Sequence, residues 1–302
     1  MNKKQMIKNS QQSSNYLPYP FFKRRKKTSI YEDMFMQDFC THFSIILGKR
    51  NEYRHFYNVD EVGGRLKALL EYDDYMFLEY DLDKLLMQNL SDMIKYGKSY
   101  VEVVKIFDEN DNLVGIKFLS FRNNIQVHFG KRIYYLLKKF DGKMIKGKID
   151  AENVIVFRIH ELGYTKRYLK RLLKNLRGFD FSFIELSNDS KSGFEFDVYT
   201  KNKDYNLLKV GHKTRWLGRK YDNYFVNEPY LLFIRMEELK LKEAILEILL
   251  CKYNEKLNEI GKTYNFSGKL CFERRTTNYD VLHKDLMDGI KNCKDVSDEV
   301  FG

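Results

Sequence analysis

The chain has 302 residues, of which 43% are hydrophobic, and a net charge of +11 at neutral pH. This length and apolar content exclude a disordered protein and are enough for one elaborate domain or two modest ones. The positive charge indicates a phosphate polymer or an acidic surface as a partner, although a chain rich in lysine and asparagine can also reflect an AT-rich genome.

Cysteine usage and hydropathy bear on the cellular setting. The four cysteines are not closely paired, which favours a reduced intracellular protein over a disulfide framework. Cys40 and His42 alone are too short a signal for a zinc site. The polar N-terminus has no apolar leader, and no run reaches the roughly 18 to 20 apolar residues of a membrane span. We therefore expect no membrane partner.

Residues 1–27 are predicted to form a mobile basic arm. Residues 1–20 are rich in asparagine, glutamine, serine and lysine, and two prolines lie at their end. Two aromatic residues and five positive charges follow, a combination that suits a nucleic-acid backbone or an acidic partner. A solvated charge run before the first helix is the alternative. The candidate DNA- or partner-facing residues of the arm are Lys23, Arg24, Arg25, Lys26 and Lys27.

Apolar residues at helical spacing predict helices over residues 31–47, 60–70 and 81–96. The last helix is followed by Gly97-Lys98-Ser99, which resembles the end of a phosphate-binding loop. Such a loop needs a glycine five residues earlier and a strand before the helix. Position 92 is Asp92, and the predicted order here is helix, then strand. Gly97 is therefore predicted to be a helix C-cap.

After Gly97 the pattern changes to that of short strands. Residues 101–120 predict a strand, a polar turn and a second strand. Strands so short and so regularly spaced predict a small antiparallel barrel or curled sheet, inserted after a helical base, and hence an α+β fold. The further β-like runs cover residues 125–129, 133–138, 143–149 and 154–159.

Residues 162–177 predict a basic amphipathic helix. Leucines line one side, and the rest holds six basic residues and no acidic one. A helix of this kind can bind DNA, a membrane surface or an acidic neighbour, and ordinary solvent exposure is the alternative. Its candidate DNA- or partner-facing residues are Lys166, Arg167, Lys170, Arg171 and Lys174.

A second, much longer helix is predicted over residues 229–260, after an irregular or β region at 178–226. Pro229 suits its first turn, and Gly261 suits its C-cap. At about 32 residues it is far longer than the average of about 11 to 12, which is typical of a helix that lies against a neighbouring copy. A core helix of the chain's own domain is the alternative. The subunit-interface candidates are Phe233, Ile245, Leu249 and Tyr253. The last predicted elements are a strand over residues 269–273 and a helix over residues 280–293.

No established catalytic motif occurs in the sequence, and the six histidines are scattered without ligand spacing. Asp141-Gly142-Lys143 resembles the Asp-x-Lys of metal-dependent nucleases, but it fits a hairpin turn better. We therefore expect no catalytic residue, no metal and no cofactor. The sequence favours a structural or binding role.

Two motifs resemble the wing region of tailed-bacteriophage portal proteins. In that family a helix ending in Tyr-Gly leads into a strand of the type YGnaYveiv, and a later strand of the type i..e.ViHi closes the wing. The residues that correspond to the first motif are Tyr96, Gly97, Ser99, Tyr100, Val101 and Glu102. Those that correspond to the second are Ile149, Glu152, Val154, Ile155 and His160. The best-matched stretch covers residues 85–160.

This resemblance implies a dodecameric ring at one capsid vertex, through which DNA enters and leaves. The implied partners are double-stranded DNA held without sequence specificity, the terminase, and capsid, neck and tail proteins. The implied setting is the virion, or the host cytoplasm during assembly, and such a protein is not an enzyme. The implied regions are a mobile basic arm (1–27), a wing-like α+β region (28–160), a first stem-like helix (161–177), a clip-like region (178–226), a long stem-like helix (227–261) and a C-terminal wing or crown remnant (262–302).

Two other functions stay open from the sequence alone. One is a basic, sequence-specific DNA-binding protein of the replication-initiator type, with residues 161–176 as its recognition helix. The other is a metal-dependent nuclease that uses Asp141.

Overall fold

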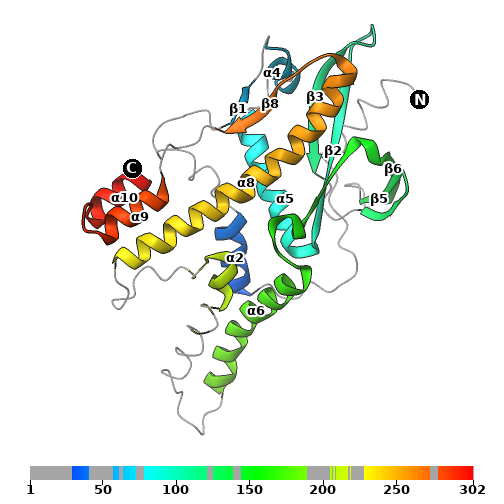
Figure 1. Ribbon diagram of the computed structural model, residues 1–302. Helices are drawn as coiled ribbons and strands as arrows, with labels where there is room; N and C mark the ends of the chain where they lie inside the picture. The colour runs from blue at the N-terminus through cyan, green and yellow to red at the C-terminus, as the bar shows by residue number, and fades with distance from the viewer. Residues whose placement is uncertain are drawn as a thin grey trace. The chain divides into compact units, whose positions relative to one another are not determined.

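The computed structural model shows an α+β chain with small antiparallel sheets, in agreement with the predicted class (Figure 1). The chain divides into two compact units, which are described separately. The first contains residues 57–166 and 248–272, and the second contains 167–247 with the segments before residue 57 and after residue 272 that the structure describes. The described residues are 29–40, 57–60, 64–72, 78–120, 125–138, 144–188, 205, 207, 209–216, 218, 228–272 and 278–301.

The described residues of the first unit form three small antiparallel sheets with the strand orders β1-β8, β3-β2-β7 and β4-β5-β6. The strands are β1 (Tyr57–Asp60), β2 (Lys98–Phe107), β3 (Leu113–Ser120), β4 (Ile125–Phe129), β5 (Arg132–Lys138), β6 (Met144–Asp150), β7 (Val154–Arg158) and β8 (Lys269–Phe272). Its helical segments are α4 (Arg65–Leu70), α5 (Leu78–Tyr96), the 3₁₀ turns η1 (Ala151–Asn153) and η2 (Ile159–Leu162), and residues 248–264 of α8 (Glu228–Tyr264).

The corner between α5 and β2 is the helix end that the sequence predicts. Gly97 has a φ of +84°, and its N–H donates to the carbonyl oxygen of Met93 at 2.8 Å. Glycine adopts this left-handed conformation without steric penalty. The helix precedes Gly97 and the strand follows it, so the C-cap prediction is confirmed.

The β2–β3 turn is also confirmed, and its polar residues explain its shape. Asp108 Oδ1 accepts hydrogen bonds from the N–H groups of Asn110 and Asn112, both at 2.8 Å. Asp111 adopts a φ of +65°, a conformation that aspartate tolerates better than most residues.

The four strands predicted after residue 124 lie within one residue of their predicted bounds, but the strands do not close into one barrel. The chain turns at η1 and returns as β7 to pair with β2, with Val101 opposite Ile155, and β7 does not pair with β6. Two three-stranded sheets result, and they share an apolar core of Tyr100, Ile133 and Val154. Of the two predicted forms, a small barrel or a curled sheet, the barrel is wrong for the described strands, because the polar turn at η1 redirects the chain from one sheet to the other.

Two predicted helix ends, at Arg177 and Gly261, are wrong. α6 (Lys166–Asn188) continues through Gly178, where an added Cβ would meet nothing within 4 Å. α8 continues through Gly261 to Tyr264. The Phe266 N–H donates to the Gly261 carbonyl oxygen at 3.1 Å, and a Cβ on Gly261 would lie 2.3 Å from the Phe266 carbonyl oxygen. Gly261 thus permits a close approach of the backbone and does not cap the helix.

Three helix starts or spans also differ from prediction. The helix predicted over 60–70 begins at Arg65, because residues 57–60 pair with β8 as β1. The helix predicted from residue 162 begins at Lys166, since Gly163 ends η2 with a φ of +76°. The helix predicted over 280–293 is two helices, α9 (Tyr279–Met287) and α10 (Cys293–Phe301).

The first predicted helix and the predicted irregular region are described only in part. Residues 30–40 form α2 (Ile30–Cys40), and residues 41–47 lie outside the described residues. Within 178–226, residues 178–188, 205, 207 and 209–214 are helical. The prediction of irregular or β structure is therefore wrong for those residues, and α6 continues through Gly178 to Asn188.

Tyr253 of α8 joins three elements of the first unit. Its side chain is fully buried, and its ring centroid lies 4.9 Å from that of Phe118 and 5.3 Å from that of Phe157. Asn89 Nδ2 of α5 donates to the Tyr253 hydroxyl at 2.5 Å, and Ser99 Oγ of β2 donates to Asn89 Oδ1 at 3.0 Å. Burial raises the pKa of Tyr253. The neutral hydroxyl is thus part of a buried network across α5, β2 and α8.

The second unit is helical in its described part, with α2, most of α6, residues 228–247 of α8, α9 and α10. Trp216, the one tryptophan of the sequence, is buried, and its indole N–H donates to Asp38 Oδ2 at 3.0 Å. Its ring meets that of Phe35 edge-on at 5.3 Å. The buried Lys242 donates to the Asp38 carbonyl oxygen at 2.8 Å. These contacts tie α2 to the rest of this unit.

Candidate nucleic-acid interface

Five positive side chains cover one side of α6, the green helix of Figure 1 that carries this label. We call this surface the basic face. At 100° per residue, its members fall within an arc of about 140° around the helix axis. All five side chains are exposed, so the structure places every predicted basic candidate of this helix at the surface. The basic face consists of Lys166, Arg167, Lys170, Arg171 and Lys174.

The opposite side of α6 is apolar and packs into the core. The four leucines there are buried, which leaves the basic face outward: Leu169, Leu172, Leu173 and Leu176. Arg177, the sixth basic residue of the segment, has a different role. It forms a two-pronged ion pair with the buried Glu32 of α2, with Arg177 Nη2 at 2.8 Å from Glu32 Oε1. The hydrogen bond with Glu32 raises the pKa of Arg177, which is therefore a structural residue.

No carboxylate of the described residues neutralises the basic face. Among the described residues, none of its five cations lies within ion-pair distance of a carboxylate, and α6 carries no acidic residue before Asp180. Some lysines elsewhere are paired, as Lys240 is with Glu237 at 3.0 Å and with Asp280 at 2.5 Å. Uncompensated charges this close together create a local positive field that attracts phosphates.

Aromatic and basic residues of the helical positions between 205 and 214 form two cation–π contacts, one of them with α6. Lys213 Nζ lies 5.3 Å from the ring centroid of Tyr168 on α6, and Lys209 Nζ lies 4.0 Å from that of Tyr205, which is 60% exposed. Tyr205, Lys209 and Lys213 recur every four residues, so helical spacing was the signal that could have found them. The sequence prediction missed them because it assigned no helix to this region.

The four predicted subunit-interface residues on α8 are mostly used by the chain's own core. Leu249 and Tyr253 have no exposed surface, and Ile245 is only 2% exposed. Phe233 is half-buried, and its ring lies 4.5 Å from that of His283. A neighbouring copy has no surface to contact on Leu249 or Tyr253 while this unit stays folded. The core-helix alternative therefore explains these two positions.

The described residues offer no evident catalytic or metal centre. They contain no group of three or more histidine, cysteine, aspartate or glutamate side chains placed to hold a metal ion. Burial raises the pKa of Glu102 on β2 to about 7, but the residues opposite it across the sheet are apolar, Leu119 and Val154. A single carboxyl among apolar neighbours does not make an acid–base pair.

Some predicted site residues lie outside the described residues. These are the arm residues Lys23, Arg24, Arg25, Lys26 and Lys27, and the nuclease candidate Asp141. Among the helices that are described, none is both long and apolar enough to cross a membrane.

Comparison with known proteins leaves the family open. No family model matches this sequence. A stretch of 141 residues is 30% identical to part of the catalytic polypeptide of DNA polymerase epsilon from Kluyveromyces lactis, and it covers 42% of this chain. The chain spans only 6% of the length of that protein. A likeness over so small a share of a relative does not establish membership of its family.

Proposed function

We propose that this chain is the repeating unit of a phage portal, a closed ring at one capsid vertex through which DNA is packaged and ejected. The observation that carries the proposal is the pairing of the two portal-like motifs. Val101 and Glu102 of the first motif lie opposite Ile155 and Val154 of the second, in adjacent strands of one sheet. The two motifs lie more than fifty positions apart in the sequence, about nine or ten typical strand lengths, and their pairing in one sheet supports the assignment of both to one wing.

The order of elements after this sheet also supports the proposal. The basic helix α6 follows β7, the long helix α8 comes later, and β8 returns to pair with β1 near the start of the first unit. A short stem helix, a clip, a long stem helix and a return to the wing is the order that the resemblance implies.

The basic face suits a channel or vertex that handles DNA without reading its sequence. Lysine and arginine at the surface contact phosphates, and each such contact adds affinity that depends on salt and not on base identity. Its five cations are supported by buried leucines and face outward. Loose, non-specific contact of this kind lets DNA slide.

The portal proposal also implies the partners: further copies of this chain, double-stranded DNA, the terminase, and capsid, neck and tail proteins. The protein would act in the virion, and in the host cytoplasm during assembly. It would perform no chemical step and need no cofactor.

Mass photometry and negative-stain microscopy of the purified full-length protein test the proposal. We expect closed rings with a mass of about twelve of the 36.3-kDa chains. A monomer or dimer at high concentration that protects specific bases would overturn it in favour of a replication-initiator type of protein. Magnesium-dependent DNA cleavage lost in Asp141→Ala would overturn it in favour of a nuclease.

A further inference from the structure

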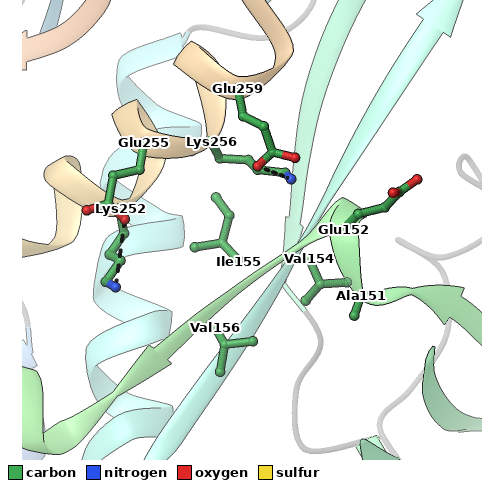
Figure 2. Close-up of a pocket in the computed structure, with 9 residues that line it drawn as sticks. All are labelled: Ala151, Glu152, Val154, Ile155, Val156, Lys252, Glu255, Lys256 and Glu259. Carbon is green, nitrogen blue, oxygen red and sulfur yellow. Dashed lines mark hydrogen bonds and ion pairs between the residues drawn. The ribbon is translucent and has the colours of Figure 1, made fainter. Parts of the chain in front are cut away.

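The outer edge of β7 is bordered by a groove. In the described part of the chain β7 pairs with β2 alone, at the end of the sheet order β3-β2-β7. A pocket of about 300 Å³ lies beside this edge, between η1, β7 and the last turns of α8, as Figure 2 shows. An unpaired strand edge beside a groove is a site where an extended segment can add as another strand.

The hydrogen bonds of β7 identify which backbone groups face the groove. The Ile159 N–H donates to the Gly97 carbonyl oxygen at 3.1 Å, so in this antiparallel pair the odd-numbered residues face β2 and the even-numbered ones face outward. The Val154 N–H donates to the Ala151 carbonyl oxygen, and the Arg158 N–H donates to Glu161 Oε2 at 3.0 Å. The Val156 N–H also faces outward, and no described residue accepts a hydrogen bond from it.

The groove carries more negative than positive charge. Lys252 lies 3.3 Å from Glu161 and 3.8 Å from Glu255, and Lys256 lies 2.7 Å from Glu259. Glu152 in η1 is exposed, lines the same pocket, and has no ion-pair partner among the described residues. Three carboxylates, those of Glu152, Glu255 and Glu259, thus line the pocket with two lysines, and the one without a described ion-pair partner is Glu152. An occupant with a positive charge near Glu152 would be favoured.

We propose that residues 16–22 of a neighbouring copy, YLPYPFF, add to β7 as an extra antiparallel strand, with Lys23 beside Glu152. This inference rests on the proposed ring. It identifies the partner of the β7 groove as the N-terminal arm of the next copy in the ring.

The prolines of this segment suit an edge strand. Pro18 and Pro20 lack N–H groups and are two residues apart, so both fall on the same edge of an extended segment. Proline is tolerated in a strand where its nitrogen faces solvent. The N–H groups of Leu17, Tyr19 and Phe21 then point to the other edge, toward β7, while the proline edge cannot be extended by a further strand.

Charge selects the direction of the added strand. With Tyr19 opposite Val156 in an antiparallel pair, Tyr19 exchanges two hydrogen bonds with Val156, and Lys23 comes opposite Glu152. A parallel strand would carry the basic run toward Arg158, where like charges repel. The five consecutive positive charges that begin at Lys23 therefore favour the antiparallel orientation.

The donor and acceptor surfaces are different, which suits a ring. A contact between an arm and a groove is heterologous, since each copy gives an arm to one neighbour and receives one from the other. Such contacts close into a ring when the rotation between neighbours allows it.

Photo-crosslinking tests this inference. The full-length chain with p-benzoylphenylalanine in place of Tyr19 is mixed with isotope-labelled chain, assembled, irradiated and digested, and mass photometry of the same sample reports whether rings are present. We expect inter-chain links from position 19 to peptides containing residues 151–158 or 252–259. In Glu152→Lys the yield should fall several-fold, and adding Lys23→Glu should restore it. The matched control Glu109→Lys, at the exposed β2–β3 turn, should leave the yield unchanged.

Each other outcome overturns the inference in a distinguishable way. Rings that give no link to these peptides leave the portal proposal standing and remove the strand addition. Links confined to a single chain show that the arm folds onto its own β7 and not onto a neighbour's. Absence of rings removes the proposed function, and this inference with it.

Discussion

The helices α6 and α8 both contain many charged residues, but several of those of α8 form ion pairs within the helix and those on the first turns of α6 do not. On α8, lysines have glutamates three or four residues away and are partly buried with them, as Lys242 is with Glu238 at 3.0 Å. On the first three turns of α6 no acidic residue occurs, and five cations face outward. A lysine therefore indicates a binding surface only when its helical neighbours fail to neutralise it.

The apolar residues of the two helices differ in the same way. α6 has one leucine stripe and one exposed face, whereas α8 has buried residues on several sides, from Leu232 to Ile260. Buried residues on more than one side are typical of a core helix of its own chain. We therefore expect substitutions in α8 to act on stability and substitutions in α6 to act on binding.

The largest expected effect is that of Leu249→Asp in α8. Leu249 is fully buried, so the substitution places an unpaired charge in an apolar environment and should lower the free energy of unfolding by more than about 4 kcal/mol. Ala244→Asp, at an exposed position of the same helix, is the matched control and should change it little. Urea unfolding of both variants measures the difference, and equal effects would contradict the core assignment of Leu249.

The next effect compares two glycines within helices. Gly261→Ala in α8 should destabilise the protein by roughly 1–3 kcal/mol, because the new Cβ would lie 2.3 Å from the Phe266 carbonyl oxygen. Gly178→Ala in α6 should stabilise it by roughly 0.5–1 kcal/mol, since its Cβ meets nothing within 4 Å. Thermal unfolding of the two variants should shift in opposite directions. Shifts of the same sign would contradict the difference between the crowded surroundings of Gly261 and the open surroundings of Gly178.

A smaller loss is expected for Tyr253→Phe. Removing the hydroxyl leaves Asn89 Nδ2 without its acceptor in a buried site, which should cost about 1–2 kcal/mol of unfolding free energy. Tyr264→Phe, near the end of the same helix and half-exposed, should change it by less than about 0.5 kcal/mol. Denaturant titration measures both, and an unchanged Tyr253→Phe would contradict the buried network.

The smallest effect on stability, under about 0.5 kcal/mol, is expected for the triple variant of Arg167, Lys170 and Lys174 to Glu. All three side chains are exposed, so binding should change instead. If each contacts one phosphate, the dependence of log affinity on log salt should weaken by about 0.9 per residue. Fluorescence anisotropy with a short random duplex at several salt concentrations measures this slope.

The control for that variant carries the same change in net charge elsewhere. Lys131, Lys146 and Lys148 are exposed on the β4-β5-β6 sheet region, and their reversal to Glu should reduce the salt dependence far less. Equal effects of the two triple variants would mean that overall charge, and not the basic face, determines DNA binding.

The sequence predicts local structure well where each element is determined by its own residues. Gly97, the Asp108 turn and the strands between residues 98 and 158 follow from backbone and turn chemistry that acts over a few positions. The basic face of α6 was predictable for the same reason, since amphipathic spacing alone places its cations opposite its leucines.

Contacts between distant parts of the chain were not predictable. Tyr57 pairs with Phe272, and no feature of either segment predicts the other as its partner. Gly261 has the sequence signature of a helix end, but it is required by the backbone at Phe266. The length of α8 suggested a neighbouring copy of the chain, whereas Phe118 and Phe157 of the same chain cover Tyr253.

Trp216 is a built-in fluorescence probe for the unfolding of one of the two units. The one indole of the sequence is buried against Phe35 in the helical second unit, with its N–H on Asp38. Tryptophan-selective emission therefore follows the melting of that unit, whereas far-ultraviolet dichroism averages over both. A difference between the melting temperatures from the two signals would show that the first unit, which contains the sheets, unfolds independently of the second.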